Sequence, residues 1–295
     1  MKTSAPEPKS ALWHQTWVRV VLYLLCAYVG LAVMLMFLEN RLLFHPTTVG
    51  QSWIDPPAAP SGRTRPMPTI TDVTLTAKDG TKIHAWWCTS KDAKGAMLYC
   101  HGNAGNLSHR GVSIIKLHDI LGVSVLIVDY PGYGKSAGSP SEAGCYAAGE
   151  AGYDWIIGEQ KIPAQKVLLY GASLGGGVIT EVACKRDHRA LILVKTFTSV
   201  PDVASEMFWW LPVPTRVLVR NRFESKNKLK SCNRPIFIGH GTTDEIIPYS
   251  HGERLFASAN EPRQFHTMHG AGHNDPLPAE FFAELQAFLA KHAAE

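Results

Sequence analysis

The chain has 295 residues, of which 45% are apolar and 18% are charged, and its formal net charge is +4. This length suits one large α/β domain or two small ones. The small charge, without a dense run of lysine and arginine, excludes the usual footprint of a nucleic-acid-binding protein. The cysteines are scattered and lack the paired spacing of a zinc site. A disulfide between Cys184 and Cys232 stays open at this point.

The first feature along the chain is an uncharged run at 20–38, "VVLYLLCAYVGLAVMLMFL". As a helix it would be about 28 Å long, close to the roughly 30 Å hydrocarbon core of a bilayer. A cleaved signal peptide and a buried core helix are the alternatives. The run is longer than a usual signal-peptide core, and no small-x-small cleavage site follows it. We therefore expect an uncleaved transmembrane anchor at 20–38, preceded by a tail at 1–19.

The charges that flank the run predict its orientation. Lys2, Lys9, Arg19 and the amino terminus precede it, whereas Arg41 follows it closely and is offset by Glu39. Positive charge tends to stay on the cytoplasmic side. We therefore expect a cytosolic N-terminus and a large domain on the exoplasmic or periplasmic side.

Residues 39–68 are expected to be a connector. The stretch is rich in proline, which favours an extended chain with little regular structure. The folded domain is then expected to occupy 69–295.

From residue 69 onward, short apolar runs alternate with helical stretches. A hairpin is expected around the turn Lys78-Asp79-Gly80. Further strands are expected at 95–100, 123–130, 166–171, 190–197, 235–240 and 263–268, with helices near 109–121, 141–158, 174–186, 249–259 and 279–292. This alternation predicts an α/β fold: a mostly parallel eight-stranded sheet with helices on both faces and the hairpin as its antiparallel edge. "EMFWWLPVP" and a basic run at 216–230 predict a small cap insertion over the sheet.

The segment 171–175 contains a candidate nucleophile. Gly171-Ala172-Ser173-Leu174-Gly175 fits G-x-S-x-G between a predicted strand and a predicted helix. A tight turn there brings the backbone close to itself, so both glycine positions must be small. Ser173 is the predicted nucleophile, and an ordinary serine cap at a helix start is the alternative.

A small flexible loop follows the strand in "LYCHGNAGN" at 98–106. Acyl transfer needs two donors aimed at the oxygen that becomes negative. We expect these donors to be the backbone N–H groups of Leu174 and Asn103. His101 is expected to bond loop backbone, because it lies on the wrong strand to act as the base.

The orienting acid is expected after the strand in "PIFIGHGTTDEIIP" at 235–248. The expected chain order is serine, then a carboxylate, then histidine. Asp244 is the preferred carboxylate, because a glycine turn fixes it beyond the strand end. Its neighbour Glu245 and the earlier Asp202 are the competitors.

The base is expected in "MHGAGHNDPLP" at 268–278. His273 lies in a loop after the last short strand and before the final helix. His269 and His266 are rivals, although His266 falls within the strand pattern. The alternative is that His273 is an exposed surface residue without a catalytic role.

Four motifs together resemble the membrane-anchored members of the α/β-hydrolase family. They are "HGNAGN" at 101–106, "DYPGYGKS" at 129–136, "GASLGG" at 171–176 and "GAGHND" at 270–275. The resemblance implies that Ser173 is the nucleophile, Asp244 the acid and His273 the base. One departure follows the sixth strand, where Lys195 and Thr196 stand in place of an acidic residue and a small residue or proline.

The expected function is serine hydrolysis of esters or thioesters through an acyl-enzyme, with no metal and no organic cofactor. The apolar stretch "MFWWLPVP", beside the predicted site on a tethered domain, suggests a lipid-like or acylated substrate. A packed cap helix with no substrate role is the alternative for that stretch. A peptidase or amidase on the same triad and a non-catalytic membrane scaffold are the other functions considered. The expected partners are the substrate and the bilayer, with no nucleic acid, and the oligomeric state stays open.

Overall fold

An eight-stranded sheet forms the centre of the domain, in the spatial order β10-β9-β8-β7-β4-β6-β3-β2. The computed structural model describes residues 9–58, 66–210 and 214–293. The strands of this sheet are β2 (Thr69–Thr76), β3 (Lys82–Thr89), β4 (Ala96–Cys100), β6 (Ser124–Val128), β7 (Val167–Ala172), β8 (Ala190–Val194), β9 (Ile236–Gly241) and β10 (Arg263–Met268). β3 pairs antiparallel with β2 and β6, and the other neighbours pair in parallel. The predicted mostly parallel sheet with an antiparallel edge hairpin is confirmed.

The main helices are α2 (Gly111–Leu121), α3 (Glu142–Gly158), α4 (Leu174–Lys185), α8 (Ser250–Ser258) and α9 (Ala279–His292). They cover both faces of the sheet, as the alternation within β4 illustrates. Leu98 and Cys100 belong to the core cluster that includes α3 and α4, whereas Met97 and Tyr99 belong to the cluster of α2 and α9. Successive side chains of a strand point to opposite faces, so an uninterrupted apolar strand indicates burial on both.

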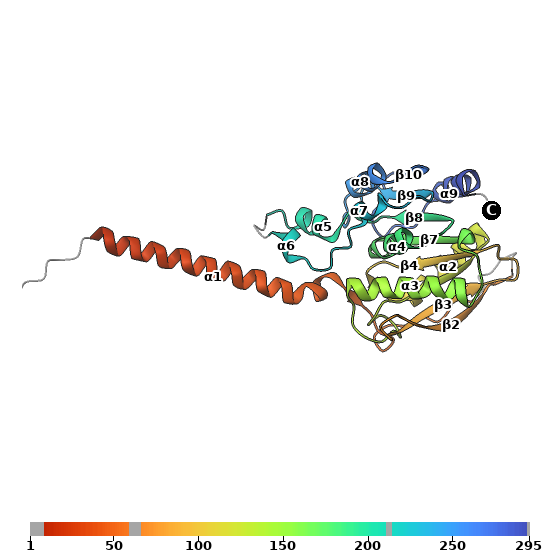
Figure 1. Cartoon of the computed structure of the whole chain (residues 1–295), viewed down its shortest axis with the longest axis horizontal. Helices are drawn as coiled ribbons and strands as arrows, with labels where there is room; N and C mark the ends of the chain where they lie inside the picture. Colours follow the sequence, from red (N-terminus) through yellow and green to blue (C-terminus); the bar gives the residue numbers. More distant parts are fainter. Residues whose placement is uncertain (1–8, 59–65, 211–213, 294–295) are drawn as a thin grey trace, which may run out of the picture.

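α1 (Lys9–Leu43) is a 35-residue helix that projects from the domain (Figure 1). It is longer than the predicted 20–38. By length and composition its Thr16–Leu43 part could cross a membrane. The side chains of 16–30 are exposed throughout, whereas Leu31, Ala32, Leu35 and Met36 are half-buried. One side of the domain end of α1 is therefore partly covered, whereas Phe37 and Leu42 stay exposed.

The connector is bound to the domain surface. Residues 39–43 of the predicted connector belong to α1, which corrects its expected start. As expected, residues 44–58 contain little regular structure, namely the two-residue strand β1 (His45–Pro46) and turns. β1 pairs in parallel with β5 (Ala104–Gly105). The side-chain amide of Asn106 donates to the carbonyls of Thr47 and Ser52, at 3.0 and 2.9 Å. The connector thus runs beside the loop after β4, because the buried side-chain amide of Asn106 finds its hydrogen-bond acceptors in the connector. Residues 59–65 of the predicted connector lie outside the described residues.

The predicted cap insertion lies between β8 and β9 and contains α5 (Val200–Met207), α6 (Thr215–Leu218) and α7 (Ser225–Leu229). Figure 1 shows α5 and α6 beside the domain end of α1. The buried carboxylate of Glu39 joins them: it accepts from the backbone amides of Arg220 and Asn221 at 2.9 and 2.7 Å, and from both of their side chains. Two buried or half-buried backbone donors are satisfied by one acid of α1, which fixes the cap against that helix.

The idea of a packed apolar cap helix is wrong for the described part of "MFWWLPVP". Phe208 is 42% exposed, Trp210 63% and Trp209 82%. Leu211, Pro212 and Val213 of the same stretch lie outside the described residues. The described large apolar side chains of this stretch therefore face outward.

The two cysteines considered as a disulfide are neighbours. Cys184, near the end of α4, has its Sγ atom 3.0 Å from that of Cys232, which follows α7. Both are free thiols. The pair packs α4 against the segment that leads to β9 without a covalent link.

Candidate active site

The turn from β7 to α4 holds Ser173 in an unusual backbone conformation, with φ 52° and ψ −122°. A side chain at Gly171 would overlap the carbonyl of Gly175, and one at Gly175 would overlap the carbonyl of Cys100. The Ser173 amide donates to the Val194 carbonyl of the next strand at 3.0 Å. Positive φ costs a residue with a side chain about 1–3 kcal/mol, which the surrounding structure must offset. Both glycines are therefore required to bring Ser173 to the carboxyl edge of the sheet.

The hydroxyl of Ser173 begins a chain of hydrogen bonds. Its Oγ lies 3.1 Å from Nε2 of His273, and Nδ1 of His273 lies 2.8 Å from Oδ2 of Asp244. An ionised carboxylate only accepts, so Nδ1 carries the proton and donates to Asp244. In the neutral imidazole Nε2 is then left to accept from the serine hydroxyl. The structure thus brings together the three residues that the sequence singled out.

Asp244 is held as an anion by its surroundings. Its carboxylate is fully buried, and burial by itself would raise its pKa. Hydrogen bonds from His240, His273 and the amide of Ile247 outweigh burial and hold the pKa of Asp244 well below its usual range. The amides of Ile246 and Ile247 donate to Oδ1 at 3.0 and 2.8 Å. The acid therefore keeps its charge at neutral pH and fixes the ring of His273.

The competing acids serve other groups. Glu245 accepts from the backbone amide of His273 at 3.2 Å, so it supports the histidine loop. Asp202 lies in the first turn of α5, where it accepts from Thr198 at 2.7 Å and pairs with Arg216.

The competing histidines are likewise placed elsewhere. His266 lies in β10 and pairs with Glu284 at 3.0 Å. His101 is fully buried, within 2.7 Å of the Gly102 carbonyl and 3.1 Å of Asp129. The expectation that His101 bonds loop backbone is confirmed. His269 is exposed, in the turn after β10.

Asn103 and Leu174, the two expected amide donors, belong to segments that meet at Ser173. Leu174 begins α4, and Asn103 follows Gly102, where an added Cβ would lie 3.3 Å from that of Ser173. Within the described part of the chain neither amide donates to another protein group. Unpaired amides at a helix start and in a close loop are the usual donors to an oxyanion.

The connector fixes the side chain of Asn103. Oδ1 of Asn103 accepts from the His45 amide at 3.2 Å and from the Tyr133 hydroxyl at 3.0 Å, and Nδ2 lies 2.9 Å from Nδ1 of His45. Tyr133 is fully buried. The residues that follow α1 directly therefore orient the loop that carries the Asn103 amide.

Lys195 holds the histidine loop from the other side. Its ammonium donates to the carbonyls of Gly272, His273 and Asp275 at 2.6, 3.1 and 2.8 Å. Burial lowers the pKa of Lys195, and the nearby charges of Asp244, Asp275 and Glu245 oppose that effect. With φ 47°, Lys195 also ends β8 earlier than the predicted strand end at 197. Lys195, which departs from the family pattern, therefore supports the loop at 272–275 that carries His273.

Two of these supports were not foreseen from the sequence. His240 is fully buried, with Nε2 2.8 Å from the Ile247 carbonyl and 3.3 Å from Asp244. The sequence feature that could have indicated His240 is its position at the end of an apolar strand, four residues before Asp244. The signal for Lys195 was a lysine that directly follows five apolar residues, since buried lysines are rarely without partners.

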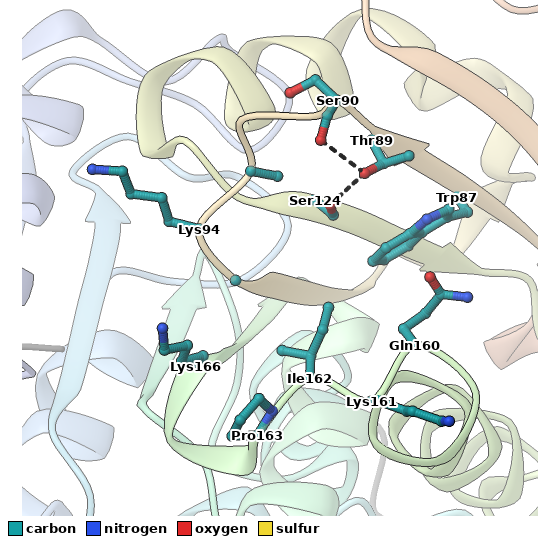
Figure 2. A pocket seen from close by; sticks show the side chains of 12 residues that line it. Trp87, Thr89, Ser90, Lys94, Ser124, Gln160, Lys161, Ile162, Pro163 and Lys166 are labelled. Atoms are coloured by element: carbon teal, nitrogen blue, oxygen red, sulfur yellow. Dashed lines mark hydrogen bonds between the residues drawn. The ribbon is translucent and has the colours of Figure 1, made fainter.

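A separate cleft of about 380 Å³ lies at the opposite edge of the sheet, between the starts of β4 and β6 and the end of α3. Figure 2 shows that its lysines, Lys94, Lys161 and Lys166, point in different directions. Ligands of parallel α/β sheets bind at the carboxyl ends of the strands, where Ser173 lies. We therefore assign no catalytic role to this cleft. In the described ranges, no three His, Cys, Asp or Glu side chains are grouped to hold a metal ion.

Comparisons with known proteins place this geometry in a family. A model of the α/β hydrolase fold matches residues 95–213. The uncharacterized protein Rv2307c of Mycobacterium tuberculosis is 35% identical over 240 residues, which cover 81% of each chain. The uncharacterized protein YfhR of Escherichia coli K12 is 31% identical over 213 residues, which cover 69% of this chain and 73% of that protein.

Solved structures share the fold. The esterase Pf2001 of Pyrococcus furiosus superposes with a TM-score of 0.63 at 18% identity, covering 81% of this chain and 98% of its own. Est1E of Butyrivibrio proteoclasticus, solved with ferulic acid, also gives 0.63, at 19% identity and with coverages of 76% and 100%. Together with the sequence relatives, these structures identify the chain as a member of the α/β-hydrolase family.

Proposed function

We propose that this protein is a membrane-anchored serine hydrolase that cleaves ester or thioester bonds. The observation that carries the proposal is the unbroken hydrogen-bond chain from Ser173 through His273 to Asp244. It lies at the carboxyl edge of the sheet, near the amides of Asn103 and Leu174, which have no acceptor among the residues that the structure describes. Nucleophile, base and orienting acid within hydrogen-bond reach are the requirement for covalent acyl transfer.

In the acylation step, Nε2 of His273 accepts the proton of Ser173 as Oγ forms a bond to the substrate carbonyl carbon. The amides of Asn103 and Leu174 donate to the oxygen that becomes negative. The intermediate then expels the alcohol or thiol, which takes the proton from His273. Asp244 stabilises the imidazolium between these two transfers.

In the deacylation step, water enters where the leaving group was. His273 accepts a proton from this water as it attacks the acyl carbon, and returns the proton to Oγ of Ser173. The acid product leaves and the enzyme regains its starting state. The protein's own side chains supply every proton transfer in this scheme.

We infer a lipid-like or acylated substrate from the position of the site. α1 supplies the proposed anchor at 20–38, and His45, two residues after its last residue, contacts Asn103. The site therefore lies close to where a bound bilayer would end. In this proposal the tail at 1–19 is cytosolic, 39–68 connects, and the hydrolase domain at 69–295 lies on the exoplasmic or periplasmic side.

Replacing the nucleophile should abolish the activity. Ser173→Ala in the full-length protein is expected to lower kcat for a chromogenic ester roughly 10⁴- to 10⁶-fold and to prevent labelling by a fluorophosphonate. Ser139→Ala, at an exposed serine, is the matched control and should be labelled like wild type. Undiminished labelling of Ser173→Ala would contradict the proposed nucleophile, and cleavage of amides but not esters would replace the esterase with an amidase.

The substrate class is tested with a series of acyl esters and thioesters of increasing chain length, using the full-length protein in detergent micelles. We expect kcat/KM to rise with chain length by up to about fourfold per methylene, because each buried methylene contributes about 0.8 kcal/mol. Ser173→Ala supplies the blank for each substrate. A preference for acetyl over longer acyl groups would contradict a lipid-like substrate.

Acidification should reveal the charge of Asp244. Because folding lowers the pKa of Asp244, its stabilising effect is complete above the unfolded-state value of about 3.9 and is lost as the pH falls through the lower folded-state value. Urea unfolding of wild type and Asp244→Asn is the measurement. The wild-type advantage should persist down to about pH 4 and shrink below it; an advantage that shrinks between pH 7 and pH 5 would contradict a depressed pKa. Asp244→Asn should also lower kcat about 10⁴-fold.

Lys195 should act through the position of His273. Lys195→Met removes three hydrogen bonds from the histidine loop and is expected to lower kcat roughly ten- to a hundredfold with little change in KM. The rate of fluorophosphonate labelling should fall in parallel. Lys166→Met, at an exposed lysine on the opposite edge, is the control. Unchanged rates in Lys195→Met would mean that the loop keeps its geometry without the ammonium.

A further inference from the structure

The cap carries exposed apolar side chains that the proposed reaction does not use. We name the cap patch as Met207, Phe208, Trp209, Trp210 and Val217. Trp209 is 82% exposed, Val217 77% and Trp210 63%. Single exposed apolar residues are normal, but a group with two tryptophans marks a surface that meets an apolar partner.

The cap patch belongs to the part of the cap that is attached to α1. Arg220 donates from Nη2 to the carbonyl of Met36 at 2.7 Å and from Nε to Glu39 at 3.1 Å. α6, which carries Val217, contacts α1. Figure 1 shows α5 and α6 extending from the domain on the same side as α1. The cap therefore packs beside the last turns of α1.

This attachment sets the level of the cap relative to a bilayer. The uncharged run of α1 ends at Leu38, so the carbonyl of Met36 lies about 3 Å before its end along the helix axis. Glu39 and Arg220 pair just beyond. If the run fills the hydrocarbon core, Arg220 lies at the boundary between acyl chains and headgroups. α6 and the cap patch then lie near the same boundary.

The chemistry of the cap suits this boundary. Tryptophan prefers the interface, where its ring is apolar and its N–H finds a polar partner. Residues 207–222 contain three arginines and no acid. Arg216 is exposed and pairs with Asp202 from α5. Apolar and tryptophan side chains flanked by arginines are the composition of segments that lie in the plane of a lipid surface.

We propose that the cap patch inserts into the interface of the bilayer that α1 enters, so that the protein holds the membrane at two places. This inference rests on the anchor proposed above and adds a second contact to it. The bilayer is the partner that α1 itself brings to the level of the cap, whereas another protein would have to reach the same depth. Insertion covers the exposed tryptophans and fixes the tilt of the domain.

The second contact has a direct consequence for the site. α5 rises from the segment after β8, next to Ser173, and the connector joins α1 to the loop of Asn103. Both membrane contacts therefore lie at the catalytic edge of the sheet. A domain tethered only by α1 could rotate this edge away from the lipid, whereas two contacts keep it facing the bilayer.

The test measures the depth of single labels in the full-length protein. The protein is reconstituted in vesicles of phosphatidylcholine with a minority of phosphatidylglycerol, and a fluorophore is placed on one cysteine at a time. Cys26, exposed in the middle of α1, reports the anchor in a Cys184→Ala background. Trp209→Cys and Val217→Cys report the cap in a Cys26→Ala, Cys184→Ala background. Gln160→Cys in that background is the control. The start of α3 lies near α1, because Asn40 bonds the carbonyl of Pro140. Gln160 is exposed and follows the other end of α3, about 25 Å away along the helix axis.

Quenching by lipids with a nitroxide near the headgroup or near the bilayer centre gives the depth. Both cap labels should be quenched more strongly by the shallow nitroxide, as expected for side chains about 5–10 Å into the interface. Cys26 should be quenched more strongly by the deep nitroxide, and Gln160→Cys by neither. Fluorophosphonate labelling of each version checks that the domain is folded.

The outcomes separate the two proposals. If Cys26 is quenched and both cap labels behave like Gln160→Cys, cap insertion is wrong and the anchor stands. If the Cys26 label is not quenched either, the anchor and the insertion both fail. Agreement between Trp209→Cys and Val217→Cys is required, because α5 and α6 should enter the interface together. A shallow label at only one of them would also overturn the proposal as stated.

Discussion

The strained turn at Ser173 is the constraint on which the rest of the structure depends. A serine with positive φ is stable here only because the Gly171 and Gly175 positions leave room for neighbouring carbonyls and because Val194 accepts its amide. The turn aims Oγ at the carboxyl edge, where the parallel strands bring the loops of Asp244 and His273. It also makes Leu174 the first helical residue, and its amide donates to no other group in the described part of the chain. The positions of the proposed nucleophile and of one proposed oxyanion donor thus follow from the same local geometry.

Around this turn, two buried charged groups each hold several polar groups in place. The fully buried carboxylate of Asp244 receives two backbone amides and two histidines, and Lys195 gathers three carbonyls of the loop that carries His273. Both sets satisfy groups that would be costly to bury alone. The loops that carry Asp244 and His273 are therefore held in place by interactions of the same kind, although they are separate along the chain.

The fold could be predicted because its signals are local: apolar runs of strand length, helical stretches and a G-x-S-x-G turn are all visible within a few residues. Ser173, His273 and Asp244 could be named because their positions after strand ends follow from the order of those elements. The roles of Lys195 and His240 could not, since each depends on a partner brought close only by folding. The contacts of the connector could not be predicted for a related reason. Its prolines indicate an extended chain, but nothing in its own sequence says that Asn106 and Asn103 will bind it.

The pairing of β1 with β5 links the proposed anchor to the loop that carries Asn103. Because His45 contacts Asn103 and follows α1 directly, a protease that cut after Leu43 would not simply shed a working enzyme into the surroundings. The released fragment would have to keep His45 and Pro46 seated without the helix that leads into them. Turnover by such a fragment would depend on its own first few residues, and soluble forms trimmed back to Thr69 would lack the strand that braces the Asn103 loop.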